Sequence, residues 1–358
     1  MEFLGAQITS MCEGKRWDRM KASRNGPSFS HVFFADDLML FAKANHKNYD
    51  AVIEVLNNLC NLASQKVNPG KSKILFSPNV SRRRKRFICR KMGMTSTKNL
   101  GRYLGFPLLT KGRSGDAYNF IVERVQNKLV GWRTKLLSRA GKLVFVRSAA
   151  SPIAEYFMQC QALPTKVCEA VDKTIRDFLW GSTKEKRKMH MVKWSIVTLP
   201  KELGGLGLHS MKDRNLAILA ILCWRLASAN GSPWAAMLSA KYLTPNRMTK
   251  EGKKLPCSSI WTACKKGGPF YVKGLKWAVR NGEQINFWMD FWLQEGTLPG
   301  LIQRPLTRGE ENITVRQYLD NETGGRAYNI SFELPGKLLD VIKATPLSID
   351  QNAEDVLH

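Results

Sequence analysis

The sequence contains 358 residues, and 44% of them are hydrophobic, which is enough for two or more domains with cores of their own. The 56 Lys and Arg residues outnumber the 29 Asp and Glu residues, so the formal net charge is +27. This composition excludes a disordered tail and favours a polyanionic partner, with nucleic acid ahead of an anionic membrane.

The sequence shows neither a secretory signal nor a membrane-spanning segment. Residues 1–17 lack the basic head, long apolar middle and cleavage site of a secretory signal. The longest apolar segment, Leu216–Trp224, is far shorter than the roughly 18 residues of a membrane-spanning helix. Eight cysteines without C-x-x-C spacing predict free thiols in a reducing compartment. We therefore expect a nuclear or cytoplasmic protein that is not secreted and not inserted in a membrane.

Two adjacent aspartates, Asp36 and Asp37, interrupt the apolar stretch HVFFADDLMLFAKA at residues 31–44. The flanking Val, Phe and Leu residues predict two short buried strands, His31–Ala35 and Leu38–Ala42, joined by a turn at the two acids. A solvated hairpin corner is one interpretation, because Asp fits turns well. Adjacent like charges repel each other, so the other interpretation is a cation held by both carboxylates.

A helix and a strand are predicted after this hairpin. The stretch NYDAVIEVLNNLCNLASQ predicts an amphipathic helix that Asn45 or Asn48 caps. After a Pro-Gly turn, a short strand is predicted at Ile74–Ser77. The predicted apolar face of the helix consists of Tyr49, Val52, Ile53, Leu56, Leu59 and Leu62.

A dense basic run, SRRRKRFICRK, follows at residues 81–91. Such a run is typical of a solvated surface or a localisation signal, and basic runs also bind nucleic acid. Its basic residues are Arg82, Arg83, Arg84, Lys85, Arg86, Arg90 and Lys91.

A second hairpin and a long helix are predicted next. The glycines of Leu100–Leu109 allow the backbone to bend there or to approach another group closely. The predicted helix Asp116–Leu137 has an apolar stripe and, about 80° round the axis, a basic stripe that can face phosphates. Lysines beside an apolar stripe are also common on ordinary surface helices. The apolar stripe is Ile121, Val125, Leu129, Trp132 and Leu136, and the basic stripe is Arg124, Lys128, Lys135 and Arg139.

The rest of the chain is predicted to be mainly helical. Helices are expected over Ala140–Cys160, with a break near Pro152, over Lys166–Trp180 and over Asp213–Ala229. Tryptophans recur between residues 180 and 292, and we interpret them as core anchors rather than base-stacking residues.

Seven segments of the sequence occur in the order found in plant LINE-type (non-LTR) retrotransposon reverse transcriptases, and the chain resembles these enzymes from about Gly26 to Leu293. A lone Asp-Asp pair would be weak support, whereas seven ordered segments are specific. The segments are GPSFSHVFFADDLMLFAKA, SQKVNPGKSKILFS, LGRYLGFPLL, RVQNKLVGWRTKLLSRAGK, DFLWGSTKEKRKMHMVKW, PKELGGLGLHSMKDRNLAILAILCWRL and INFWMDFWL.

This resemblance implies an α+β fold: a partial palm of a right-hand polymerase, followed by a mainly helical thumb and a helical C-terminal region. The implied boundaries are 1–110 for the partial palm, 111–190 for the thumb, 191–293 for a Trp-rich helical connector and 294–358 for a segment without a clear element.

The resemblance also implies the site residues. Asp36 and Asp37 correspond to the aromatic-x-Asp-Asp motif and would be ligands of catalytic Mg²⁺ in a two-ion site. Asn68 would shape the next turn, and Lys71 would stabilise or protonate the leaving pyrophosphate, although a plain solvated turn lysine is the alternative.

By the same resemblance, the second hairpin and the long helix hold the substrates. Tyr103 and Gly105 would lie near the primer end. Arg124, Lys128, Lys135 and Arg139 would track the backbone of an RNA template paired with a DNA primer, and deoxynucleoside triphosphates would be the other substrate.

The sequence also departs from the family. Glu2, Glu13 and Asp18 do not match the third palm carboxylate, which the family carries on an earlier strand followed by a nucleotide-selecting segment. We therefore expect a truncated copy that is inactive alone, because two ligands without the third bind metal weakly. A basic protein that binds nucleic acid without catalysis is the alternative.

Overall fold

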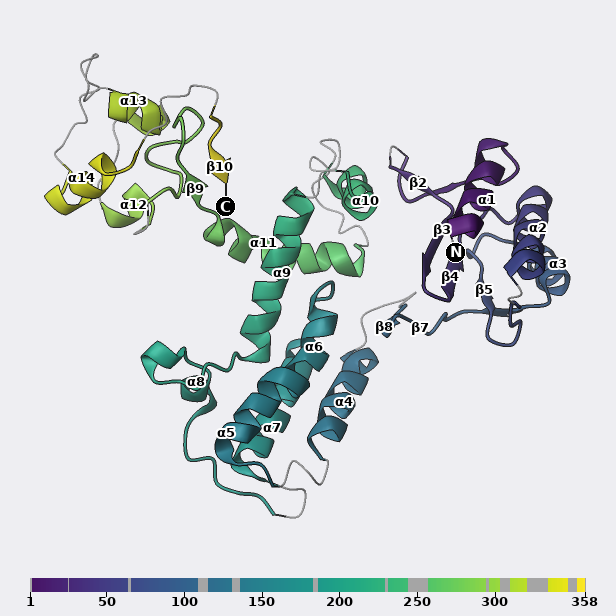
Figure 1. Cartoon of the computed structure of the whole chain (residues 1–358), viewed down its shortest axis with the longest axis horizontal. Helices are drawn as coiled ribbons and strands as arrows, with labels where there is room; N and C mark the ends of the chain where they lie inside the picture. Colours follow the sequence, from purple (N-terminus) through teal and green to yellow (C-terminus); the bar gives the residue numbers. More distant parts are fainter. Residues whose placement is uncertain are drawn as a thin grey trace. The chain divides into compact units, whose positions relative to one another are not determined.

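The structure, a computed structural model, forms two compact units, Met1–Gly268 and Pro269–His358 (Figure 1). The four-part division drawn from the sequence stays a prediction, as does the partial palm with thumb. The structure describes residues 2–24, 26–63, 66–108, 115–130, 136–182, 186–228, 231–243, 257–293, 296–302, 310–320, 334–346 and 353–357.

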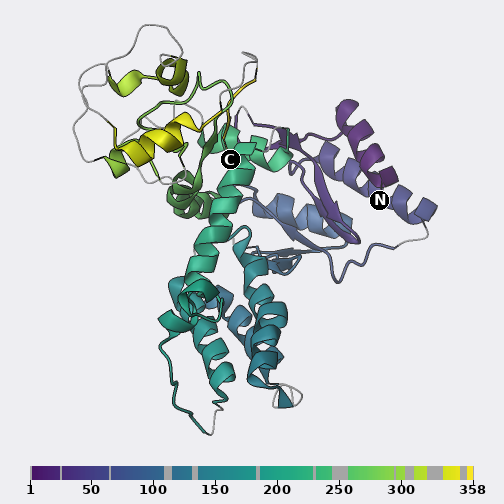
Figure 2. The same ribbon diagram turned by 60° about the vertical axis from the view of Figure 1, so that its left-hand side comes forward.

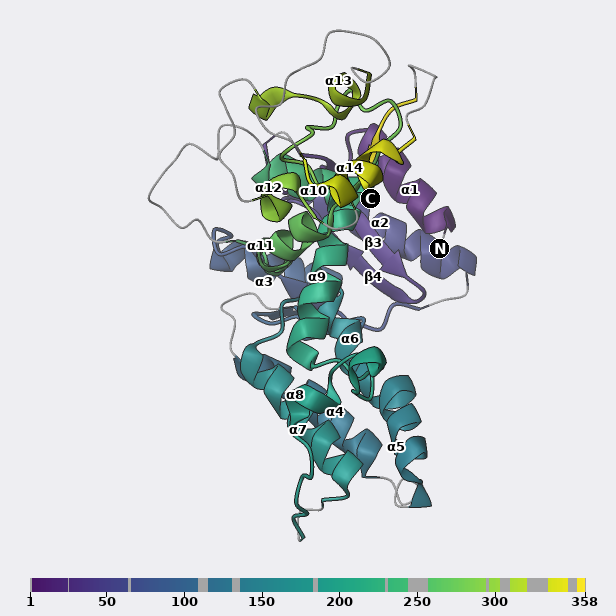
Figure 3. The same cartoon turned by 90° about the vertical axis from the view of Figure 1, so that its left-hand side faces the viewer.

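The first unit begins with helices and short strand pairs around one small core. In order these are α1 (Glu2–Glu13), β1 (Met20–Lys21), β2 (Ser28–Phe29), β3 (His31–Phe34), β4 (Asp37–Leu40) and α2 (His46–Ala63). Strands β1 and β2 pair antiparallel, as do β3 and β4. Figure 3 shows the β3–β4 hairpin beside α2. The buried core residues are Leu4, Ile8, Trp17, Ala51, Val52, Val55, Leu56 and Leu59, with Leu38 and Leu40 of β4 packed against them.

The predicted helix after the hairpin is confirmed, and the structure decides between its two candidate caps. The side-chain oxygen of Asn45 accepts a 2.9 Å hydrogen bond from the Asn48 backbone N–H, so Asn45 caps α2. Asn48 is fully buried and donates to Asp18. Leu62 does not belong to the buried face, because its side chain is 67% exposed near the end of the helix.

A parallel strand pair connected by a helix follows. Strands β5 (Lys73–Leu75) and β6 (Thr95–Thr97) pair in parallel, and α3 (Arg82–Met92) lies between them in the chain. Parallel neighbours need such a crossover. Ser81 caps the start of α3, and Gly93 ends it with a left-handed φ of 66°. The antiparallel pair β7 (Arg102–Tyr103) and β8 (Phe106–Pro107) comes next.

Helices of the first unit build the largest core (Figure 2). They are η1 (Gly115–Tyr118), α4 (Asn119–Leu129), α5 (Arg139–Phe145), η3 (Val146–Ala150), α6 (Ser151–Met158) and α7 (Thr165–Trp180). The predicted break near Pro152 is confirmed, since η3 is a π-helical segment and Pro152 lies in the first turn of α6. The predicted helix over Lys166–Trp180 is confirmed as α7.

Short and long helices complete the first unit. They are α8 (Trp194–Val197), η4 (Lys201–Leu203), α9 (Met211–Ser228), α10 (Pro233–Tyr242) and α11 (Ser259–Gly274), the last of which continues past Gly268. A methyl group placed on Gly267 of α11 would lie 2.4 Å from the Leu219 backbone of α9. Only glycine permits this close crossing. No helix within the described residues is both long and apolar enough to cross a membrane.

The second unit contains β9 (Trp277–Ala278), α12 (Leu298–Leu301), η6 (Glu310–Asn312), α13 (Val315–Asp320), α14 (Gly336–Lys343) and β10 (Val356–Leu357). Its core includes the buried Trp288 and Trp292, as expected of anchors, whereas Trp224 on α9 of the first unit is 37% exposed and does not fit that prediction. The buried Asp355 carboxylate accepts hydrogen bonds from the backbone N–H groups of Arg280, Gly282 and Gln284. Short elements therefore exist after residue 294, where the sequence pattern predicts none, because helices of four to eight residues are too short to show a clear periodicity in sequence.

Candidate nucleic-acid interface

The two aspartates lie at the tip of the β3–β4 hairpin, as predicted, although the strand ends differ. Phe34 pairs with Asp37, so the loop consists of Ala35 and Asp36 alone. Ala35 has a left-handed φ of 51°, which two-residue hairpin loops require but which glycine usually provides. An alanine in this conformation costs about 1 kcal/mol. Both aspartates are exposed, side by side at the turn.

The two faces of this hairpin differ in burial. Phe33 faces inward, where a methyl group on Gly5 of α1 would lie 3.5 Å from its ring. Val32 and Phe34, on the opposite face with Asp37, are 47% and 61% exposed. The prediction of two buried strands is therefore wrong for one face, because helices cover only the other. Asp37 lies at the edge of an open apolar surface.

The hairpin tip supplies the ligand type that Mg²⁺ prefers, but not a complete set. Carboxylate oxygens are hard ligands, and the side chains of Asp36 and Asp37 are both accessible. No group of three or more His, Cys, Asp or Glu side chains suited to a metal ion occurs within the described residues. The geometry thus fits part of a two-ion site.

Lys71 is exposed to solvent in the turn before β5. The Asn68 side-chain oxygen accepts a 3.1 Å hydrogen bond from the Lys71 backbone N–H, and the Asn68 carbonyl accepts a 3.0 Å bond from Ser72. The predicted role of Asn68 in shaping this turn is confirmed. Lys71 is exposed, which agrees with either interpretation of that lysine.

The β7–β8 hairpin forms the tight turn that its glycines predict. Leu104 and Gly105 both have left-handed φ values, 48° and 80°, as in a type I′ turn. The Tyr156 hydroxyl of α6 donates a 2.7 Å hydrogen bond to the Leu104 carbonyl. The Phe106 ring packs 5.1 Å from the Phe157 ring. The hairpin is therefore fixed to helix α6.

The Tyr103 hydroxyl beside this turn is buried and has no hydrogen-bond partner among the described residues. A buried hydroxyl without a partner is unfavourable by itself.

Helix α4 carries part of the predicted basic stripe. Ile121, Val125 and Leu129 are buried on one side, whereas Arg124 and Lys128 are exposed on another. The two stripes are thus confirmed over Asn119–Leu129.

The prediction of a single long helix over Asp116–Leu137 is wrong. The first residues form the 3₁₀ turn η1, α4 ends at Leu129, and Arg139 begins the separate helix α5. The Ser138 hydroxyl starts that helix by accepting a 3.1 Å hydrogen bond from the Gly141 N–H. Leu136 is 80% exposed and belongs to none of the buried clusters within the described residues. Lys135 and Trp132 lie outside the described residues.

Sequence reasoning missed Arg102, which connects the two predicted substrate-holding elements. Its guanidinium carbon lies 3.8 Å from the centroid of the Phe120 ring of α4. The Arg124 guanidinium carbon lies 5.4 Å from the same centroid. Two cations therefore flank one ring next to the β7–β8 turn. The only signal in the sequence was the position of Arg102 beside Tyr103.

Two plant proteins are similar to the chain. It is 37% identical over 190 residues to an Arabidopsis thaliana protein named "Putative ribonuclease H protein At1g65750", and the match covers 52% of this chain and 31% of that protein. It is 27% identical over 148 residues to the Arabidopsis thaliana "Uncharacterized mitochondrial protein AtMg00310", over 41% of this chain and 96% of that protein. The matched region is thus about a third of the first relative. No protein-family model matches the chain.

Proposed function

We propose that the protein is the palm-and-thumb part of an RNA-directed DNA polymerase of a plant LINE-type (non-LTR) retrotransposon. The observation that carries the proposal is the segment Phe34-Ala35-Asp36-Asp37, which presents two adjacent carboxylates at the tip of a two-residue hairpin turn. This is the arrangement expected of an aromatic-x-Asp-Asp polymerase motif. The similarity to plant proteins, and to one named for ribonuclease H, supports the same lineage.

In this proposal the carboxylates of Asp36 and Asp37 would hold Mg²⁺, and an ion bound there would supply positive charge for the reacting phosphate. Lys71, which is exposed on the turn that Asn68 shapes, would in this proposal donate a proton to the leaving pyrophosphate.

The primer end is proposed to lie at the β7–β8 turn. The Gly105 backbone lets a strand approach closely, and we include the neighbouring Tyr103 from the sequence resemblance. Arg124 and Lys128 on α4 are exposed for phosphate contacts, and we include Lys135 and Arg139 from the sequence resemblance. Such contacts read backbone shape rather than sequence.

A protein that binds nucleic acid through charge alone is the second candidate, and the net charge of +27 favours it. The two candidates differ in what they recognise. A polymerase distinguishes a recessed primer 3′ end from a blunt end, whereas charge alone does not.

Competition binding tests this difference. A fluorescent RNA–DNA hybrid with a recessed DNA 3′ end is displaced by unlabelled recessed or blunt hybrids of equal phosphate number. The proposal predicts that the recessed competitor is severalfold more effective, and that Tyr103→Ala removes this preference without abolishing binding. Equal competition by both hybrids would favour the charge-only candidate.

A further inference from the structure

Helix α3 presents a face of arginines that the proposed function does not use. Seven of its eleven residues are basic. Positions 82, 86 and 90 repeat every four residues and position 83 lies next to them, so these side chains share an arc of about 100°. The exposed residues on this outer face are Arg82, Arg83, Arg86 and Arg90.

This face is electrostatically unfavourable for the helix by itself. The first turn contains three arginines and no acid, although the positive end of a helix dipole favours anions. Like charges four residues apart also repel. No ion pair neutralises the four arginines within the described parts of the chain. An external anion would relieve this repulsion.

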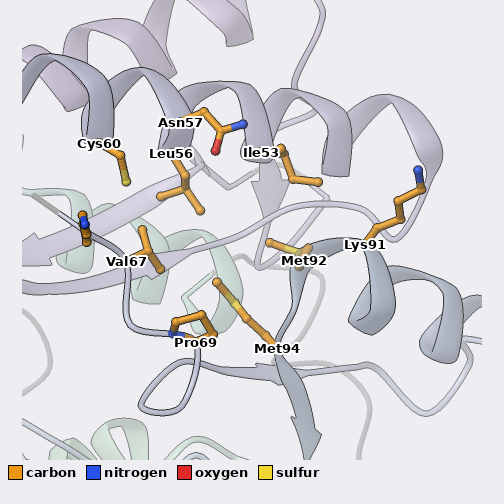
Figure 4. Close-up of a pocket in the computed structure, with 10 residues that line it drawn as sticks. Ile53, Leu56, Asn57, Cys60, Val67, Pro69, Lys91, Met92 and Met94 are labelled. Atoms are coloured by element: carbon orange, nitrogen blue, oxygen red, sulfur yellow. The ribbon is translucent and has the colours of Figure 1, made fainter.

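The rest of α3 is fixed to the protein, so the spacing of the arginines is set before any ligand binds. Ile88 is buried, and the Phe87 ring lies 5.1 Å from the His46 ring and 5.6 Å from the Tyr49 ring. Met92 and Lys91 line a pocket of about 350 Å³ against α2, shown in Figure 4. A preorganised row of cations binds a regularly spaced polyanion at low entropic cost.

We propose that Arg82, Arg83, Arg86 and Arg90 bind consecutive phosphates of a nucleic-acid duplex without reading its sequence. A membrane surface fits less well, because an interfacial helix buries an apolar face in the lipid, and the apolar residues Ile88 and Met92 of α3 face the protein instead. The proposal is independent of catalysis at the Asp36–Asp37 hairpin.

Salt-dependent binding tests this proposal with the full chain. The affinity for a 30-base-pair duplex is measured by fluorescence anisotropy across a salt series, for the wild type and for a variant with all four arginines changed to Gln. Each lost phosphate contact reduces the slope of log K against log salt by about 0.9, so we expect a reduction of about 3 to 4. The Arg83→Gln, Arg86→Gln double variant should show half of this reduction.

Matched control variants distinguish the loss of the α3 arginine face from the loss of the same positive charge elsewhere on the protein. The control variant Lys166→Gln, Lys173→Gln, Lys201→Gln, Lys212→Gln removes the same charge from exposed positions on other helices and should change the slope by less than about 1. A fourfold Arg→Lys variant should keep most of the slope. The proposal is overturned if the fourfold Arg→Gln variant of α3 and the fourfold Lys→Gln control variant lose the same affinity for the duplex. It is also overturned if the α3 variant keeps duplex binding and loses only binding to phosphatidylserine vesicles.

Discussion

The guanidinium of Arg102 on β7 packs over the ring of Phe120 on α4, with 3.8 Å between the guanidinium carbon and the ring centroid. This contact connects the turn proposed to hold the primer end with the helix proposed to follow the backbone. The guanidinium keeps its charge while its flat face covers the ring, so Arg102 can serve both the fold and a phosphate.

Arg102→Ala should therefore weaken both stability and hybrid binding. Loss of the cation–π contact is expected to lower the free energy of unfolding by about 0.5 to 1 kcal/mol, measured by urea denaturation. Loss of a phosphate contact should reduce the salt slope of hybrid binding by about 0.9. Phe120→Leu is the matched control: it should reproduce the stability loss and keep the salt slope. A similar slope change in both variants would contradict a phosphate contact by Arg102.

Tyr156→Phe tests whether the β7–β8 turn must be fixed to α6. The substitution removes only the hydrogen bond to the Leu104 carbonyl, which should cost about 1 kcal/mol of stability. The preference for a recessed over a blunt hybrid should fall, while the affinity for the blunt hybrid stays constant. An unchanged preference would mean that the turn does not contact the primer end.

Ala35→Gly should stabilise the β3–β4 hairpin. Glycine adopts the left-handed φ of 51° without strain, and this gain exceeds its greater entropy loss on folding by about 0.5 kcal/mol. The measurement is the midpoint of urea denaturation. A lower midpoint for the variant would show that the Ala35 conformation is not strained.

A half-buried carboxyl beside the helical core, Asp172, predicts a pH dependence of stability. Burial raises the pKa of Asp172 to about 6 from 3.8, even though its carboxylate accepts hydrogen bonds from the Met211 backbone N–H. Between these two pH values the folded protein binds more protons than the unfolded chain, so stability falls as the pH rises through this window. The Asp172→Asn variant has no ionisable group at this position, so its free energy of unfolding should not show this dependence on pH. An identical slope in both proteins would contradict the prediction.

The chain of 358 residues is predicted not to extend a primer by itself. The hairpin offers two carboxylates, and metal sites of this kind need more ligands in fixed geometry. Purified protein and its Asp36→Asn variant are compared on a poly(rA) template with an oligo(dT) primer and Mg²⁺. Primer extension by the wild-type protein and not by the Asp36→Asn variant would contradict the prediction, because it would show that the metal site at the hairpin is complete.

The local features of the site could be predicted from particular residues. Glycines around Tyr103 predicted the second hairpin, and the apolar residues around Asp36 predicted the first. Burial could not be predicted, because Val32 and Phe34 resemble core residues in sequence and only the tertiary arrangement leaves them uncovered. The stacking of Arg102 on Phe120 joins residues that no periodic pattern connects.

The C-terminal end of α4 is a second feature that could not be predicted from the sequence. The apolar and basic stripes continue in sequence to Leu136 and Arg139, so the sequence predicts that the helix ends at Leu137, whereas α4 ends at Leu129. The next helix, α5, begins at Arg139, one residue from its predicted start at Ala140, because the Ser138 side chain accepts a hydrogen bond from the Gly141 N–H.

The most direct measurement of the proposed function is the position of the primer 3′ end on the protein. A DNA primer with a photoreactive 4-thiothymidine at its 3′ end is annealed to an RNA template and cross-linked to the chain, and the labelled peptide is identified by mass spectrometry. A primer labelled at its 5′ end is the control. The polymerase account predicts that the 3′ label marks the peptide containing Tyr103 and Gly105, and that the 5′ label does not. Equal labelling of many basic surfaces by both primers would contradict it.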